Sequence, residues 1–149
     1  MKSQMRILAV FVAFAVTACS GRSASSSGPS AAGATAGTPK VELAFLNHSP
    51  VLMALTDVNA LLASYGDKVA VTRYDLETDE GARFVKSKRL KGHVPIAIFV
   101  NGSMEIKLKD RTVNFFSFPE GKGTSMVASG SWTVEDLRQA IDQALNRAK

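Results

Sequence analysis

Hydrophobic positions beyond residue 40 follow two different periods. Val41, Leu43 and Phe45 alternate with Glu42 and Ala44, a pattern typical of a strand with one covered face. The spacing then changes to steps of three and four, which predicts an amphipathic helix. Its buried stripe would consist of Val51, Ala54, Leu55, Val58, Leu61, Leu62 and Tyr65.

The ends of this helix have residues suited to them. Ser49 is expected to be the N-cap, and Pro50 the first helical residue, where a missing N–H costs no hydrogen bond. Gly66 is expected to end the helix. The next run, Lys68 to Tyr74, is β-branched and alternating, so it predicts a second strand. Because a helix joins the two strands, they are expected to be parallel.

The second half of the chain continues the alternation of helices and strands. Thr78 is expected to cap a helix that ends near Leu90. The run Pro95 to Val100 is apolar on both faces, as expected of a central strand, and the Asn101-Gly102 pair predicts a tight hairpin turn. A strand over about 104–108 is therefore expected to return antiparallel to Pro95–Val100.

The last predicted elements are a short strand and a clear helix. Phe115 to Phe118 is interpreted as a strand that ends at Pro119. Thr133 is expected to cap the final helix, with a buried stripe that includes Leu137 and Ile141. We expect Trp132 to anchor this helix to the sheet. The predicted order is βαβαββα, an α/β fold with a central mixed sheet flanked by helices.

The N-terminus has the features of an export signal. Two cationic residues, Lys2 and Arg6, precede the apolar run Ile7–Val16, which is shorter than the roughly 20 residues of a membrane-spanning helix. Val16-Thr17-Ala18-Cys19 resembles the lipobox of bacterial lipoproteins, in which the thiol is acylated. We therefore predict a signal peptide over 1–18 and a membrane anchor at Cys19. The alternative is an ordinary signal peptide with an incidental cysteine.

A linker separates this anchor from the folded part. Residues 19–39 consist almost entirely of Ser, Ala, Gly, Thr and Pro, a composition that cannot bury enough apolar surface to fold. The single domain is therefore expected to span 40–149, a length that suits one core. Three of the 18 basic residues and none of the 13 acidic ones precede residue 40, so the domain has a net charge of +2. This weak charge and the export signal argue against a nucleic-acid partner. The basic cluster between Arg83 and Lys91 is interpreted as a solvated helix face.

Several residues then indicate a family resemblance. His48-Ser49-Pro50-Val51 follows the first strand where thioredoxins have Cys-Gly-Pro-Cys, and Glu42 takes the position of their buried acid. Val94-Pro95 resembles the stretch that contains the cis-proline of that family, although His93 is an additional residue. The chain over 40–149 therefore resembles a thioredoxin-like domain. The stretch between 107 and 131 is longer than that fold needs and is expected to hold an extra hairpin or loop.

The domain lacks the cysteine sulfur atoms that give thioredoxins their activity. Thiol–disulfide exchange requires a thiolate, and Cys19 is the only cysteine. We therefore expect no enzyme activity and no cofactor. The resemblance implies that backbone beside the cis-proline can bind an extended partner. The predicted partner-binding residues are those of the CxxC-equivalent turn and the proline loop: His48, Ser49, Pro50, Val51, Val94 and Pro95.

Two alternatives remain open from the sequence. His48 and His93 are the only histidines and are expected at the same end of the sheet, which would suit a copper or zinc carrier. Met53 could add a third soft ligand, although its helical spacing favours a core position. The domain could also assist an envelope redox system whose cysteines belong to a partner. In each case we expect a lipid-anchored protein that faces the periplasm, with the outer membrane favoured because Ser20 follows Cys19. We also expect Glu42, if buried, to have a raised pKa, or else to be exposed on an edge strand.

Overall fold

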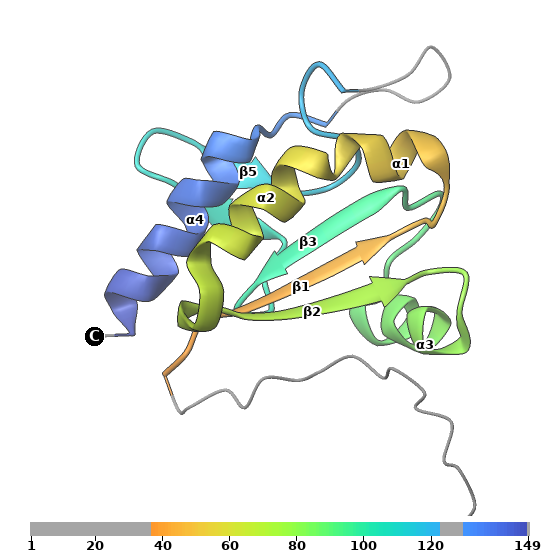
Figure 1. Ribbon diagram of the computed structural model, residues 1–149, viewed down its shortest axis with the longest axis horizontal. Helices are drawn as coiled ribbons and strands as arrows, with labels where there is room; N and C mark the ends of the chain where they lie inside the picture. Colours follow the sequence, from red (N-terminus) through yellow and green to blue (C-terminus); the bar gives the residue numbers. More distant parts are fainter. Residues whose placement is uncertain (1–36, 123–129, 149) are drawn as a thin grey trace, which may run out of the picture.

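Helices cover both faces of a mixed β-sheet in the computed structural model, which describes residues 37–122 and 130–148 (Figure 1). The predicted signal peptide, Cys19 and nearly all of the linker lie outside the described residues. The elements are β1 (Lys40–Phe45), α1 (Ser49–Ala54), α2 (Thr56–Tyr65), the 3-10 turn η1 (Gly66–Lys68), β2 (Ala70–Asp75), α3 (Asp79–Lys88), β3 (Ile96–Val100), β4 (Glu105–Lys107), β5 (Thr112–Asn114) and α4 (Val134–Arg147).

The main sheet has the order β2-β1-β3, so β1 is its central strand. β1 is parallel to β2, with Lys40 opposite Ala70, and antiparallel to β3, with Phe45 opposite Ile96. Helices α1 and α2 connect the parallel pair, as the sequence predicts. The expectation of an α/β fold with a mixed sheet flanked by helices is thereby confirmed.

The alternation of side chains along the strands divides the core into two faces. On one face, Leu43 of β1 packs in a cluster with residues of α1, α2 and α4 and with the fully buried Trp132, which precedes α4. On the other face, Ala44 packs with Phe84 of α3 and Phe99 of β3. Figure 1 shows the same division, with α1, α2 and α4 on one side of the sheet and α3 on the other. All five residues of β3 are buried, as expected of a strand that is apolar on both faces.

The single helix predicted between Val51 and Tyr65 is in fact two helices. The interruption lies at Leu55, whose ψ of −4° departs from the roughly −42° of an α-helix. The N-cap is also one residue earlier than expected: it is His48, and Ser49 is already helical. The His48 side chain makes no capping hydrogen bond to α1 among the described residues. The position of Gly66 is as predicted, because it ends α2 with a φ of +53°.

The strand after β3 was expected to pair with β3 in a hairpin, but it pairs with another strand. Among the described residues, two isolated bridges, Val100–Ser103 and Ala97–Phe116, join β3 to residues that follow it, and β4 pairs with β5 instead. The strand predicted over Phe115–Phe118 is not continuous, because Ser117 adopts a left-handed φ of +66°. This segment still reaches the sheet, since Ile98 N–H donates to the Phe115 carbonyl at 3.0 Å. β4 is the strand expected near residues 104–108, so only the turn and β5 of the β4–β5 hairpin lie in the long stretch after residue 107, where an extra hairpin or loop was expected.

The remaining two helices begin as the sequence predicts. The Thr78 hydroxyl accepts a hydrogen bond from Gly81 N–H at the start of α3. At α4, Thr133 and Asp136 form a reciprocal capping box. In the part of the chain that the structure describes, no helix has both the length and the apolar character needed to cross a bilayer.

Candidate functional site

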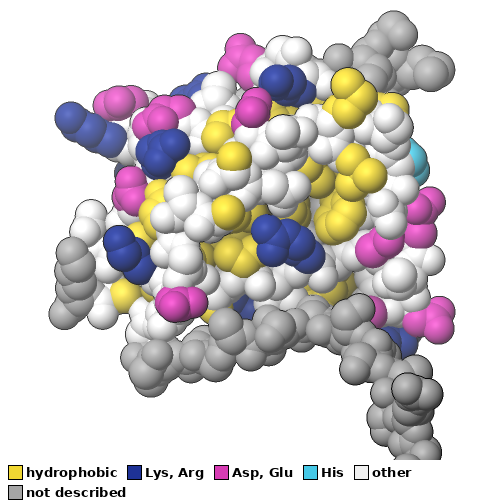
Figure 2. All heavy atoms as spheres, viewed as in Figure 1, with side chains coloured by type: hydrophobic (Ala, Val, Ile, Leu, Met, Phe, Trp, Pro, Cys, Tyr) yellow, Lys and Arg dark blue, Asp and Glu magenta, His cyan; other side chains and the backbone are white. Residues whose placement is uncertain are grey.

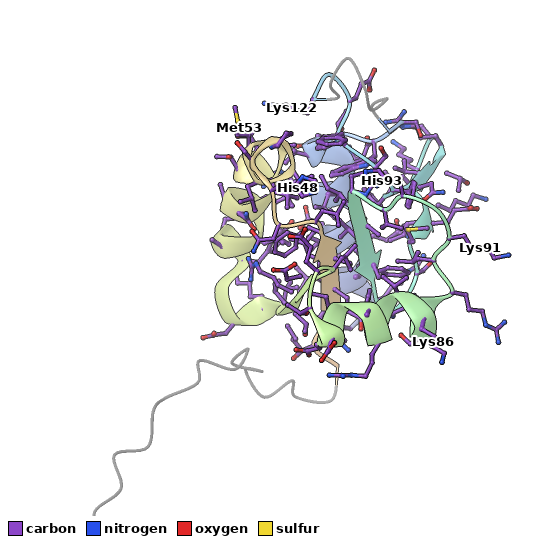
Figure 3. The ribbon with its side chains drawn as sticks, turned by 90° about the vertical axis from the view of Figure 1, so that its right-hand side faces the viewer. His48, Met53, Lys86, Lys91, His93 and Lys122 are labelled. Carbon is purple, nitrogen blue, oxygen red and sulfur yellow. The ribbon has the colours of Figure 1, made fainter. Side chains whose placement is uncertain are left out.

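The loop after β1 and the loop before β3 lie at the same end of the sheet. Their proximity follows from the register, because Leu46 N–H donates to the Pro95 carbonyl at 3.0 Å. His48 follows Leu46 by two residues, and His93 precedes Pro95 by two. Both histidines are exposed, and Figure 3 shows them on the side of the molecule that carries these two loops. The sequence-based expectation that the two histidines share one end of the sheet is therefore confirmed.

The predicted partner-binding residues fall into an exposed and a buried group. His48, Ser49 and Pro50 are exposed, but the side chains of Val51, Val94 and Pro95 are buried. Within the described residues there is no cis peptide bond, so the Pro95 bond is trans. Its carbonyl is also engaged by Leu46, as described above. The side chains that a partner can reach are therefore those of the turn that precedes and opens α1.

Two residues of α1 extend this exposed turn. Leu52 is 43% exposed and Met53 is 71% exposed, and they are the large hydrophobic side chains classed as exposed among the described residues. The expectation that Met53 belongs to the core was wrong. Both residues fall outside the apolar stripe of the predicted helix, and this off-stripe position was the available sequence signal. We use the term α1 surface for His48, Ser49, Pro50, Leu52 and Met53. Figure 2 shows hydrophobic side chains exposed over this end of the molecule.

An ion pair borders the α1 surface. Lys122 Nζ lies 3.3 Å from Asp57 Oδ2, and both side chains are more than half exposed. The pair links the turn at Lys122 to the first turn of α2. Lys122 and Met53 lie at the same upper end of the molecule in Figure 3. Exposed pairs of this kind contribute little to stability. The Lys122–Asp57 pair is therefore a charged edge of the α1 surface and not a structural support.

A metal site would need more ligands than this region provides. Over 37–122 and 130–148, no group of three or more His, Cys, Asp or Glu side chains could hold a metal ion. His48 and His93 therefore lack a third ligand of these types in the described residues. Met53 is a soft side chain five residues after His48 in the sequence.

Two clefts lie away from the predicted residues. One, of about 290 Å³, is lined by residues of β4 and α4 that include Lys107 and Arg147. The second, of about 410 Å³, shares Gln143 and Arg147 with the first. Neither contains a residue of the α1 surface. The α1 surface is thus an exposed patch outside both clefts, a shape that suits a macromolecular partner better than an enclosed small molecule.

Glu42 is buried on the central strand, not on an edge. It is 5% exposed, and its carboxylate binds Lys88 Nζ at 2.5 Å and Lys40 Nζ at 2.9 Å. Lys88 also lies over the Phe99 ring, 4.6 Å from its centroid. Burial by itself would raise the pKa of Glu42, but the two ammonium groups outweigh it and lower that pKa. The expected raised pKa is therefore wrong, because the sequence does not reveal these two partners.

Lys88→Met is expected to lower the free energy of unfolding by about 2 kcal/mol at neutral pH, because it leaves Glu42 buried with one cation. The lowered pKa of Glu42 stabilises the wild type above the carboxyl's ordinary value of 4.5, and this contribution disappears as pH falls through the lowered folded-state pKa. The difference in the free energy of unfolding between wild type and variant should therefore shrink as the pH falls below 4.5. Urea unfolding at several pH values would measure it. Lys86→Met, at an exposed position of the same helix, is the control, and an equal loss in both variants would contradict the role of the pair.

The basic cluster around α3 is only partly a solvated face. Arg83, Lys86, Arg89 and Lys91 are exposed as expected, whereas Lys88 turns inward to Glu42. The inward lysine removes one cation from the cluster.

Comparisons with protein-family models, curated proteins and solved structures find no match to this chain.

Proposed function

We propose that this protein is a lipid-anchored, thioredoxin-like binding module of the cell envelope that has no thiol chemistry of its own. Its α1 surface would bind an envelope protein or peptide. The observation that carries the proposal is the exposure of Leu52 and Met53 beside the exposed turn His48–Pro50. Exposed apolar side chains that lie next to each other mark interaction sites more often than singly scattered ones do.

The order of elements supports the thioredoxin-like part of the proposal. The central strand β1 has a parallel neighbour reached through a helix and an antiparallel neighbour on its other side. The chain enters α1 directly after β1, where thioredoxins have their cysteine pair. At that place this chain has His48 and Val51, and Cys19 is its only cysteine. Without a thiolate in the domain, exchange with a disulfide has no nucleophile.

The chemistry of the α1 surface supports binding through apolar contact. Leu52 and Met53 supply apolar area, while His48 and Ser49 supply hydrogen-bonding groups at its edge. Methionine adapts its shape to different partners, because its side chain is unbranched and polarizable. A lipid anchor at Cys19 and the linker would keep this surface within a limited distance of the membrane. We place the module on the periplasmic side, on the outer membrane in preference to the inner one.

A double substitution should separate the α1 surface from the rest of the molecule. Leu52→Ser with Met53→Ser is expected to reduce capture of the partner by at least about tenfold, because truncation of central apolar contacts in an interface costs about 1–3 kcal/mol. A photo-crosslinking residue at position 52 of the full chain, expressed in cells, would identify the partner. The same residue at the exposed position Gln139 on α4 is the matched control. Identical adducts from positions 52 and 139, or undiminished capture by the double variant, would refute binding through α1.

Measurements on the purified protein and on its captured partner distinguish binding from the alternative functions, which are metal transport and assistance to an envelope redox system. Titration with copper or zinc, followed by the NMR signals of His48 and His93, would support a metal carrier if both histidines shift at submillimolar metal. A captured partner that has its own cysteine pair would favour the accessory role in an envelope redox system. Catalytic reduction of insulin disulfides by the purified protein would overturn the proposal that the domain lacks thiol chemistry.

A further inference from the structure

Three methionines occur in the predicted domain, and their surroundings differ. Met53 is 71% exposed on α1. Met104 is partly buried and packs against both core clusters. Met126 lies outside the described residues. Because an oxidant must reach the sulfur atom, exposure makes Met53 a much better target than Met104.

The contact between the Ser49 hydroxyl and the Met53 sulfur also suits methionine sulfoxide, the oxidised form of this side chain. Ser49 Oγ lies 3.9 Å from Met53 Sδ, one helical turn earlier on the same face of α1. In this contact the hydroxyl donates to a thioether, which is a weak acceptor. A sulfoxide oxygen is a stronger acceptor than a thioether, so Ser49 is positioned to donate to the product.

We propose that Met53 is an oxidation site that controls the α1 surface, an inference that rests on the proposed function. The reactant is a two-electron peroxide oxidant. The Met53 sulfur attacks one oxygen of hydrogen peroxide, an S–O bond forms as the O–O bond breaks, and the other oxygen leaves as water after proton transfer. The thioether is oxidised to the sulfoxide, and the peroxide is reduced. Methionine sulfoxide reductases reverse the change with a thiol reductant.

The consequence for binding follows from the change in polarity. Met53 is the more exposed of the two apolar side chains on the α1 surface, and its sulfoxide is polar. A partner pocket that accepts the thioether would have to desolvate the S–O group. Oxidation therefore weakens binding while the core remains intact, since Met53 is not part of it.

Hydrogen peroxide added to the full chain, carrying Cys19→Ser to prevent acylation and thiol oxidation, tests the first step. Trypsin places Met53, Met104 and Met126 on separate peptides, 41–68, 92–107 and 123–138, so mass spectrometry follows each sulfur independently. Met53 is expected to gain one oxygen about tenfold faster than Met104. Equal rates, or faster oxidation of Met104, would overturn the assignment of Met53.

Capture of the cross-linked partner tests the second step. Peroxide is expected to reduce capture by the wild-type chain about tenfold, the loss expected of an apolar contact made polar. Met53→Leu should make capture insensitive to peroxide, because it has no sulfur at this position, so the ratio of its capture with peroxide to its capture without peroxide should stay near one. Met53→Gln should reproduce the loss without peroxide. Rapid oxidation of Met53 with unchanged capture would refute the switch but not the binding function. Absence of capture by every unoxidised chain would instead refute the proposed function and leave the oxidation result valid.

Discussion

Gly81→Ala is expected to lower the free energy of unfolding by about 3 kcal/mol, although alanine normally favours a helix over glycine by about 1 kcal/mol. Gly81 lies in the first turn of α3, directly behind the turn that leaves β2. A Cβ atom at this position would lie 2.0 Å from the Asp75 carbonyl oxygen and 2.6 Å from the Leu76 Cα. Both are backbone atoms, so no side-chain rotation relieves the clash. The start of α3 would have to move away from β2.

Urea unfolding of the Cys19→Ser chain with and without Gly81→Ala would measure this loss. Ala82→Gly is the control, because Ala82 is the exposed neighbour in the same helix and its replacement tests helix propensity alone. We expect the control to cost about 1 kcal/mol or less. A Gly81→Ala variant as stable as the wild type would show that α3 does not need the close approach to β2.

Trp132→Ala is expected to destabilise the protein by about 4 kcal/mol, within the range for the loss of a large buried aromatic side chain. Trp132 is fully buried, and its ring packs edge to face on Phe115, with 5.7 Å between the ring centroids. Its indole N–H donates to the Phe116 carbonyl at 3.1 Å and also lies 3.3 Å from the Ser117 carbonyl. The residue thus fixes the start of α4 to the segment that pairs with β3.

The substitution Trp132→Phe separates packing from hydrogen bonding. It retains an aromatic ring against Phe115 but removes the indole N–H, and we expect it to cost about 2 kcal/mol. Thermal or urea unfolding of both variants provides the comparison. A loss in Trp132→Ala no greater than that in Trp132→Phe would mean that the hydrogen bonds, and not the packed ring, hold α4 in place.

Local signals in the sequence were sufficient for most of the elements. The capping residues Thr78 and Thr133 and the glycine at 66 act within one helical turn of their own backbone, so their roles do not depend on the fold. The apolar run of β3 was likewise interpretable, because only a strand covered on both faces is apolar at every position. The hairpin after β3 was not, since its turn fixes a change of direction but not which strand becomes the partner.

At the candidate site, too, some features could be predicted from the sequence and others could not. The sequence places His48 and His93 on loops at one end of the sheet, and the register agrees. It did not indicate that Val94 is buried, and Met53 was expected in the core although it lies outside the stripe of the predicted helix. Those outcomes depend on which face of a short helix or loop is turned to the core, and the interruption at Leu55 falls in the middle of the predicted stripe.

By itself, the sequence determined that residues 40–149 contain no thiol and that their helices and strands alternate in an α/β order. Both follow from residue identity and from short-range backbone preferences. Only the tertiary structure decided that Glu42 is ionised between Lys88 and Lys40, and how far Leu52 and Met53 are exposed. These properties depend on groups far apart in the chain, since Lys88 belongs to α3 and Glu42 to β1. Such neighbours set the charge and the exposure of the side chains at a site. The spacing of hydrophobic residues along the sequence does not specify which residues become neighbours.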